Sequence, residues 1–165
     1  MSKKFDGNDS VKKTITQKNK KALANADVVN LAAYRQAVKQ TNSKTILIVD
    51  DEPITRTTLK KIFENEEHTV LTAKDGMELA KIIESIKLDL ILLDIQLPWI
   101  NGNEICAIIR ENEHYKNLPI AMISGINREE EIQKSFDAGC NDFITKPFEV
   151  ETLKQVVNKL LFQTN

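Results

Sequence analysis

The feature that most limits the possible folds is a fivefold alternation along the chain after Lys44. Short apolar runs alternate with segments whose apolar residues recur at the spacing of a helix face. The runs are TILIV, TVLTA, LDLILL, PIAMI and DFIT, at residues 45–49, 69–73, 88–93, 119–123 and 142–145. After the second run, the helix face consists of Leu79, Ile82, Ile83 and Ile86. The alternation predicts five β-strands, each followed by an α-helix.

Strands of this composition belong to a parallel sheet. Runs that are apolar throughout indicate strands buried on both faces, and a helix after each strand supplies a right-handed crossover to the next. We therefore expect an α/β fold with a doubly wound sheet of five parallel strands. Because ligands bind beyond the carboxyl ends of the strands in such sheets, the residues that follow each run are the candidates for a functional site.

Capping patterns predict where two of the helices begin. Asp75 precedes Glu78 by three positions, and Asn127 precedes Glu130 by three positions. This is the arrangement of a capping box, in which the first residue accepts a hydrogen bond from the helix N-terminus. We expect Asp75 and Asn127 to be N-cap residues.

Five polar residues stand at the ends of the predicted strands. They are Asp50 and Asp51 after the first run, Asp94 after the third, Ser124 after the fourth and Lys146 after the fifth. Two carboxylates about 5 Å apart repel each other by roughly 3 kcal/mol at an effective dielectric of about 20, so a cation is expected between them. Oxygen ligands without His or Cys favour Mg²⁺. A nearby carboxylate can attack phosphorus while a hydroxyl and an ammonium bind the transferred group, which predicts phosphoryl transfer to a carboxylate.

Four sequence blocks carry a resemblance to a known family. The blocks are LIVDDEP, LILLDIQLPWINGNEI, AMISG and AGCNDFITKPF. Through them, residues 44 to about 162 resemble the receiver domain of two-component response regulators. The resemblance implies a flavodoxin-like (βα)5 fold with strand order 2-1-3-4-5 and a role in phosphorelay signal transduction.

The resemblance also implies an acceptor and a metal site. Asp94 corresponds to the phosphoacceptor of the family. Asp50, Asp51 and Asp94 correspond to the residues that hold Mg²⁺, for which Mn²⁺ is a possible substitute, and the backbone carbonyl of Gln96 corresponds to a further metal ligand. Of the adjacent acids, we expect Asp51 to be the more direct ligand.

The remaining implied roles concern a conformational switch. Ser124 corresponds to the hydroxyl that turns toward the phosphoryl group, Lys146 to the residue that forms an ion pair with it, and Phe143 to an aromatic rotamer switch. The Lys146–Pro147 peptide bond is expected to be cis. Many members carry Tyr where this chain has Phe143, and we expect Trp99 to be a partly exposed ring near the site, with a buried structural ring as the alternative.

The expected function is signalling through contact with other proteins. The implied phosphodonor is a histidine kinase or a histidine phosphotransfer protein, and catalysis is expected only for the protein's own phosphorylation and dephosphorylation. An effector is expected to read the face made by the fourth predicted helix, the fifth strand and the fifth helix. Because the chain ends four residues after Leu161, we expect a single-domain regulator without an output domain. A phosphorelay intermediate that passes the phosphoryl group on is the alternative.

Residues 1–43 are predicted to be a basic extension of the receiver at residues 44–165. The extension has a net charge of +6, and the remainder has a net charge of −7. Residues 1–21 are Lys-rich and predicted to be disordered, whereas residues 25–40 can form a helix that docks on the receiver or on a partner. An inert linker and tail-mediated binding to nucleic acid or a membrane are open alternatives.

The cysteines and the apolar runs predict the compartment. No apolar run approaches the ~20 residues that span a bilayer, and the Lys-rich start lacks the apolar core of a signal peptide. Cys106 and Cys140 have no metal-like spacing. We therefore expect a cytoplasmic protein whose two thiols are buried and reduced.

Overall fold

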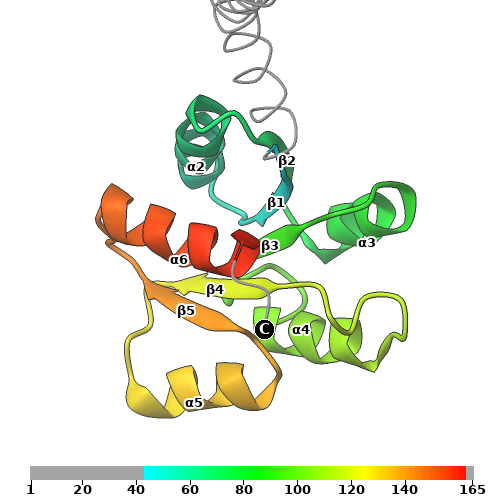
Figure 1. Ribbon diagram of the computed structural model, residues 1–165. Helices are drawn as coiled ribbons and strands as arrows, with labels where there is room; N and C mark the ends of the chain where they lie inside the picture. Colours follow the sequence, from blue (N-terminus) through cyan, green and yellow to red (C-terminus); the bar gives the residue numbers. More distant parts are fainter. Residues whose placement is uncertain (1–42, 163–165) are drawn as a thin grey trace, which may run out of the picture. The chain divides into compact units, whose positions relative to one another are not determined.

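The computed structural model describes residues 43–162, so the predictions for residues 1–21 and 25–40 lie outside the described part. Strands and helices alternate through it (Figure 1). The elements are β1 (Thr45–Val49), α2 (Pro53–Asn65), β2 (Thr69–Ala73), α3 (Gly76–Ser85), β3 (Leu90–Asp94), α4 (Gly102–Glu111), β4 (Ile120–Ser124), α5 (Glu129–Asp137), β5 (Asp142–Thr145) and α6 (Val150–Phe162). Within residues 43–162, no helix is long and apolar enough to cross a membrane.

The five strands form one parallel sheet in the order β2-β1-β3-β4-β5. This confirms the expected fold class and the strand order implied by the resemblance. Asp94 at the end of β3 is paired in register with Ile123 of β4, and the next residue of β4, Ser124, is paired with Thr145 of β5. The carboxyl ends of the central strands therefore meet at one edge of the sheet.

Alternate residues of each central strand face two separate hydrophobic layers. In β3, Ile91 and Leu93 lie in the layer that contains buried residues of α3 and α4. Leu90 and Leu92 lie in the opposite layer, which contains buried residues of α2 and α6. Burial of each such side chain contributes about 1.5–3 kcal/mol to the stability of the fold. The packing on both faces therefore holds the sheet in place beneath its polar edge.

The start of α5 differs from the prediction. The helix begins at Glu129 with Arg128 as its N-cap, whose side chain makes no capping hydrogen bond, so the predicted cap at Asn127 is wrong. The acidic first turn of α5 interacts favourably with the helix dipole, which compensates for the missing cap. Ser135 is the buried residue of this helix, and Phe136 is 43% exposed. α5 is thus less deeply packed than α3 and α4, each of which buries two or more apolar side chains.

The start of α3 agrees with the prediction. The carboxylate of Asp75 accepts a hydrogen bond from the backbone N–H of Glu78 at 2.9 Å. The side chain of Glu78 in turn accepts one from the backbone N–H of Lys74 at 3.0 Å. These two bonds satisfy donors that a helix N-terminus leaves free.

Two strands begin later than predicted, at Leu90 and Ile120. The Asp89 side chain accepts a hydrogen bond from the Thr45 N–H at 2.8 Å, which replaces a main-chain partner before β3. Pro119 has no N–H to contribute to the sheet before β4. Side chains, not the apolar run alone, therefore determine these two boundaries.

The two cysteines are buried and unpaired, as expected. Burial raises the pKa of the Cys106 thiol. It also raises the pKa of the Cys140 thiol, to about 12. Both thiols are therefore protonated at neutral pH and pack as small apolar groups.

Candidate functional site

Three carboxylates meet at the polar edge of the sheet. Asp50 and Asp51 follow β1, and Asp94 ends β3, the strand next to it. One carboxylate oxygen from each of the three residues lies within 4.8 Å of the others. Asp50 and Asp94 are buried, whereas Asp51 is exposed. Three oxygen donors at this separation, one of them open to solvent, match the ligand preference of Mg²⁺, which retains several waters.

Lys146 bridges the two buried acids. Its Nζ donates hydrogen bonds to Asp50 Oδ2 at 2.6 Å and to Asp94 Oδ2 at 2.9 Å. Lys146 is placed by its backbone N–H, which donates to the carbonyl of Ser124 at 2.7 Å, and its peptide bond to Pro147 is cis. The partly buried ammonium of Lys146 offsets the repulsion between the carboxylates of Asp50 and Asp94.

Burial and hydrogen bonding compete in setting the pKa of these groups. Burial raises the pKa of Asp94, and the hydrogen bonds from Lys146 and from the backbone N–H of Gln96 offset this only in part. Burial alone would lower the pKa of Lys146, but its hydrogen bonds to Asp50 and Asp94 outweigh that effect and raise it. The ammonium therefore stays charged while the neighbouring carboxyl is easier to protonate than an ordinary aspartate.

Backbone N–H groups hold the second oxygen of each buried acid. The N–H of Glu52 donates to Asp50 Oδ1 at 2.8 Å, and the N–H of Gln96 donates to Asp94 Oδ1 at 3.0 Å. Both bonds join an aspartate to the residue two positions later, which is the pattern of an Asx turn. Each buried carboxylate is thus oriented by a turn on one side and by Lys146 on the other.

The other predicted residues lie on β4, β5 and the β3–α4 loop. Ser124 is fully buried, and its Oγ accepts a hydrogen bond from the N–H of Ile126 at 3.1 Å. Phe143 is half-buried against the layer that contains α3 and α4. The side chain of Gln96 is exposed. Trp99 is 99% exposed, so the alternative of a buried structural ring is wrong.

Two residues of the site were not among the predicted ones. Arg56 donates from Nη1 to the backbone carbonyl of Asp50 at 2.6 Å, which fixes the end of β1 from α2. Gly102 brings the first turn of α4 against the backbone of Asp94: a Cβ at this position would lie 2.2 Å from the Asp94 carbonyl oxygen. A Gly at the start of a predicted helix was the available signal for the second residue, whereas nothing distinguished Arg56 from other surface cations.

The parallel sheet, with an acidic cluster and a lysine at its carboxyl edge, defines a flavodoxin-like fold with a candidate metal and phosphoryl site. Residues 46–158 match the family model of the response regulator receiver domain. The chain belongs to this family. Receiver domains of two-component systems are phosphorylated on an aspartate, bind Mg²⁺ and interact with histidine kinases or phosphotransfer proteins.

Individual relatives share the receiver at 35–38% identity. The chain is 38% identical over 116 residues to the CAI-1 autoinducer sensor kinase/phosphatase CqsS of Vibrio cholerae, covering 70% of this chain and 17% of that protein. It is 37% identical over 119 residues to the aerobic respiration control protein ArcA of Escherichia coli, covering 72% and 49%. The solved structure of response regulator TrrA of Thermotoga maritima in complex with Mg(2+)-BeF is 35% identical with a TM-score of 0.65, covering 72% and 99%. The chain therefore spans half or less of the length of CqsS and of ArcA.

Proposed function

We propose that Asp94 is the phosphoacceptor of this receiver and that Asp50, Asp51 and the carbonyl of Gln96 contribute to its Mg²⁺ site. The observation that carries the proposal is the contact of Lys146 with two buried acids of a three-carboxylate cluster. Such a cation is placed to neutralise an incoming phosphoryl group as well as the free acids. Its position supports the role in pairing with the phosphoryl group that the family resemblance implies.

The chain's own groups supply the main requirements of the reaction. An oxygen of Asp94 attacks the phosphorus of a phosphohistidine or acyl phosphate donor, the bond to the leaving group breaks, and an aspartyl phosphate remains. The backbone N–H of Gln96 orients the carboxylate, and Lys146 balances its charge. Mg²⁺, or Mn²⁺ in its place, would neutralise the phosphoryl oxygens when bound.

The switch is proposed to run through Ser124 and Phe143. Phosphorylation adds about −1.5 to −2 charges and three acceptor oxygens. The hydroxyl of Ser124, one residue beyond the register partner of Asp94, would exchange its bond with the Ile126 N–H for one to the phosphoryl group. Phe143 would then move into the space that the Ser124 side chain leaves, which biases a pre-existing equilibrium between two states.

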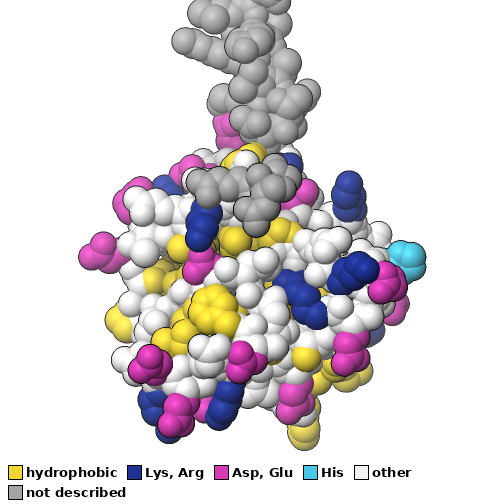
Figure 2. All heavy atoms as spheres, turned by 60° about the horizontal axis from the view of Figure 1, so that its bottom comes forward, with side chains coloured by type: hydrophobic (Ala, Val, Ile, Leu, Met, Phe, Trp, Pro, Cys, Tyr) yellow, Lys and Arg dark blue, Asp and Glu magenta, His cyan; other side chains and the backbone are white. Residues whose placement is uncertain are grey.

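The effector is proposed to bind the face of α5, β5 and α6. Phe136 on α5 and Val150 on α6 are each 43% exposed, which suits a protein partner. Figure 2 turns the lower part of the Figure 1 view, with α4 and α5, toward the viewer, and shows hydrophobic side chains among charges of both signs. This mixed surface favours a protein over nucleic acid as the partner of the visible face.

The protein is proposed to act in the cytoplasm as a response regulator that receives its phosphoryl group from a histidine kinase or a phosphotransfer protein. The similarity to a receiver within the sensor kinase/phosphatase CqsS favours a second candidate, a phosphorelay intermediate. The two functions differ in how binding of the output partner depends on phosphorylation. An effector prefers one state of the switch, whereas a relay partner needs to recognise both.

Replacing Asp51 with Asn tests the metal site without breaking the contacts of Lys146. We expect the Mg²⁺ concentration for half-maximal labelling by radiolabelled acetyl phosphate to rise about tenfold or more, because the cluster loses one charged ligand. The same shift is expected in an Mg²⁺ titration followed by the emission of Trp99, which lines the same hollow as Asp51. Glu104→Gln, in that hollow but outside the cluster, is the control. An unchanged Mg²⁺ requirement in Asp51→Asn would contradict the assignment.

Affinity capture with fluoroberyllate separates the effector from the relay function. The full chain, immobilised with Mg²⁺ and with or without fluoroberyllate as the phosphoryl mimic, is expected to retain an effector at least about tenfold better with the mimic. Asp94→Asn is the control, in which the mimic should have no effect. Equal retention in both states, by a partner that contains a phosphorylatable histidine, would favour the relay instead.

A further inference from the structure

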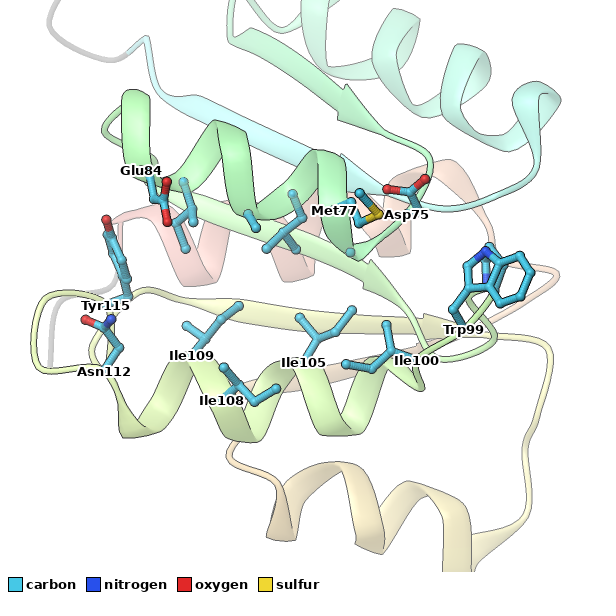
Figure 3. A pocket seen from close by; sticks show the side chains of 15 residues that line it. Asp75, Met77, Glu84, Trp99, Ile100, Ile105, Ile108, Ile109, Asn112 and Tyr115 are labelled. Carbon is cyan, nitrogen blue, oxygen red and sulfur yellow. The ribbon is translucent and has the colours of Figure 1, made fainter.

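An open groove runs between α3 and α4 and takes no part in the acidic cluster (Figure 3). It has a volume of about 480 Å³, and its walls include Leu79 and Ile83 from α3 and Ile105, Ile108 and Ile109 from α4. Figure 3 shows Trp99 at one end of the groove and Tyr115 at the other. The walls are therefore apolar side chains presented by two neighbouring helices, with an aromatic residue at each end.

Three large apolar side chains along this groove are exposed to water. Trp99 is 99% exposed, Met77 is 72% exposed and Ile108 is 58% exposed. Trp99 also has a φ of 74°, a left-handed conformation that a bulky residue adopts at a cost of about 1–3 kcal/mol. An exposed ring in an unfavourable backbone conformation does nothing for the stability of the receiver, and tryptophan is enriched among the residues that dominate binding interfaces.

The charges on the groove have one sign. Asp75 lies at the start of α3, and Glu84 lies near its end. Among the described residues that line the groove, none is Lys or Arg. Figure 3 shows both acids at the edge, one near Trp99 and the other near Tyr115. A partner that fills this groove therefore meets an apolar floor with a carboxylate toward each end.

We propose that the α3–α4 groove, defined by the residues above, binds an amphipathic helix of a partner protein. The apolar face of that helix lies on the isoleucines of α4, and Lys or Arg residues beside that face pair with Asp75 and Glu84. Helix-in-groove recognition uses anchors at i, i+3, i+4 and i+7, a span of about 10 Å. α3 and α4 have ten residues each, about 15 Å, so both walls accommodate this spacing. The proposal is independent of phosphorylation at Asp94.

The test uses two synthetic helical peptides of about 16 residues without tryptophan. One has Leu at i, i+3, i+4 and i+7 with Lys beside them, and the other has Glu in place of every Lys. Because Trp99 is the one tryptophan of the chain, its emission reports directly on the groove. Titration of the full chain with the basic peptide is expected to give a saturable blue shift, with an affinity about tenfold or more above that of the acidic peptide.

Two substitutions in the groove, each with a control elsewhere on the full chain, locate the binding site. Ile108→Lys is expected to weaken binding of the basic peptide about tenfold or more. The control is Ile54→Lys, which changes an exposed apolar residue of α2 and is expected to leave this binding unchanged. Glu84→Lys is expected to reverse the preference between the peptides, while Glu130→Lys on α5 leaves the preference unchanged. All four positions are at least partly exposed, and an unchanged melting temperature establishes that each variant is folded.

Several outcomes would overturn the proposal. These are equal affinity for the two peptides, absence of a Trp99 shift with either, or binding that Ile108→Lys does not weaken. A Trp99 shift on dilution of the chain alone, lost in Ile108→Lys, would assign the groove to a second copy of the chain. A Trp99 shift caused by deletion of residues 1–42 alone would assign it to a segment of the same chain.

Discussion

Replacing Asp94 with Asn is expected to abolish labelling by acetyl phosphate, with a loss of at least about a hundredfold in rate. The amide has nearly the same volume as the carboxylate but is a poor nucleophile toward phosphorus. The buried position of Asp94 and its hydrogen bonds from Lys146 and the Gln96 N–H mean that the change acts on one group in a fixed geometry. Intact-mass measurement and radiolabelling after a fixed time determine the rate.

Stability and a matched control complete the test of Asp94. Burial raises the pKa of Asp94 above its usual value, so the folded protein disfavours the charged form of this carboxyl. Protonation of Asp94 therefore stabilises the folded state, and this stability is lost as the pH rises through the raised pKa. The uncharged Asn is therefore expected to leave the melting temperature unchanged or higher. Asp137→Asn, an exposed acid on α5 bound to Gln133, should be labelled at the parent rate. Normal labelling of Asp94→Asn would mean that another group is the acceptor.

Replacing Gly102 with Ala is expected to lower the free energy of unfolding by about 3 kcal/mol. The added Cβ would lie 2.2 Å from the carbonyl oxygen of Asp94 and 2.9 Å from the Cα of Ile95. Both contacts are with backbone, so no side-chain rotation relieves them. The N–H of Gly102 also donates to the Ile95 carbonyl at 2.8 Å, which ties the first turn of α4 to the same segment. Thermal unfolding should show a melting temperature about 10 °C lower.

Gly125→Ala is the matched control for this substitution. A Cβ on Gly125 would meet nothing within 4 Å, so its effect on unfolding should stay within about 0.5 kcal/mol. Labelling of Gly102→Ala by acetyl phosphate should also fall, because the strain acts on the backbone of Asp94, the proposed acceptor. A melting temperature equal to that of the parent would show that α4 can move away from β3 without loss of packing.

The central features of the fold were predictable because buried parallel strands leave a strong pattern. The continuous apolar runs predicted the strands, and the residues at their ends, among them Asp50, Asp94 and Lys146, converge as the topology requires. The convergence follows from geometry: strands that run in one direction end at one edge. No knowledge of side-chain packing was needed for it.

Other features depend on how helices pack against each other, which periodicity does not reveal. The sequence pattern of α5 did not predict that Phe136 is exposed or that Arg128 is the N-cap residue. The spacing of Ile105, Ile108 and Ile109 is that of a helix face, but it does not reveal that part of this face stays open along a groove. Whether two helices cover the side chains between them depends on the side-chain volumes of both helices. The sequence pattern of one helix does not contain this information.

The bridge made by Lys146 joins parts of the chain that are far apart in sequence. Its two hydrogen bonds span 96 residues to Asp50 and 52 residues to Asp94, and β5, which precedes it, is an edge strand of the sheet. During synthesis the two acids therefore leave the ribosome long before the cation that balances them. Lys146 reaches the acidic cluster only when the last strand has joined the sheet, so full competence for phosphorylation is expected only after β5 is in place.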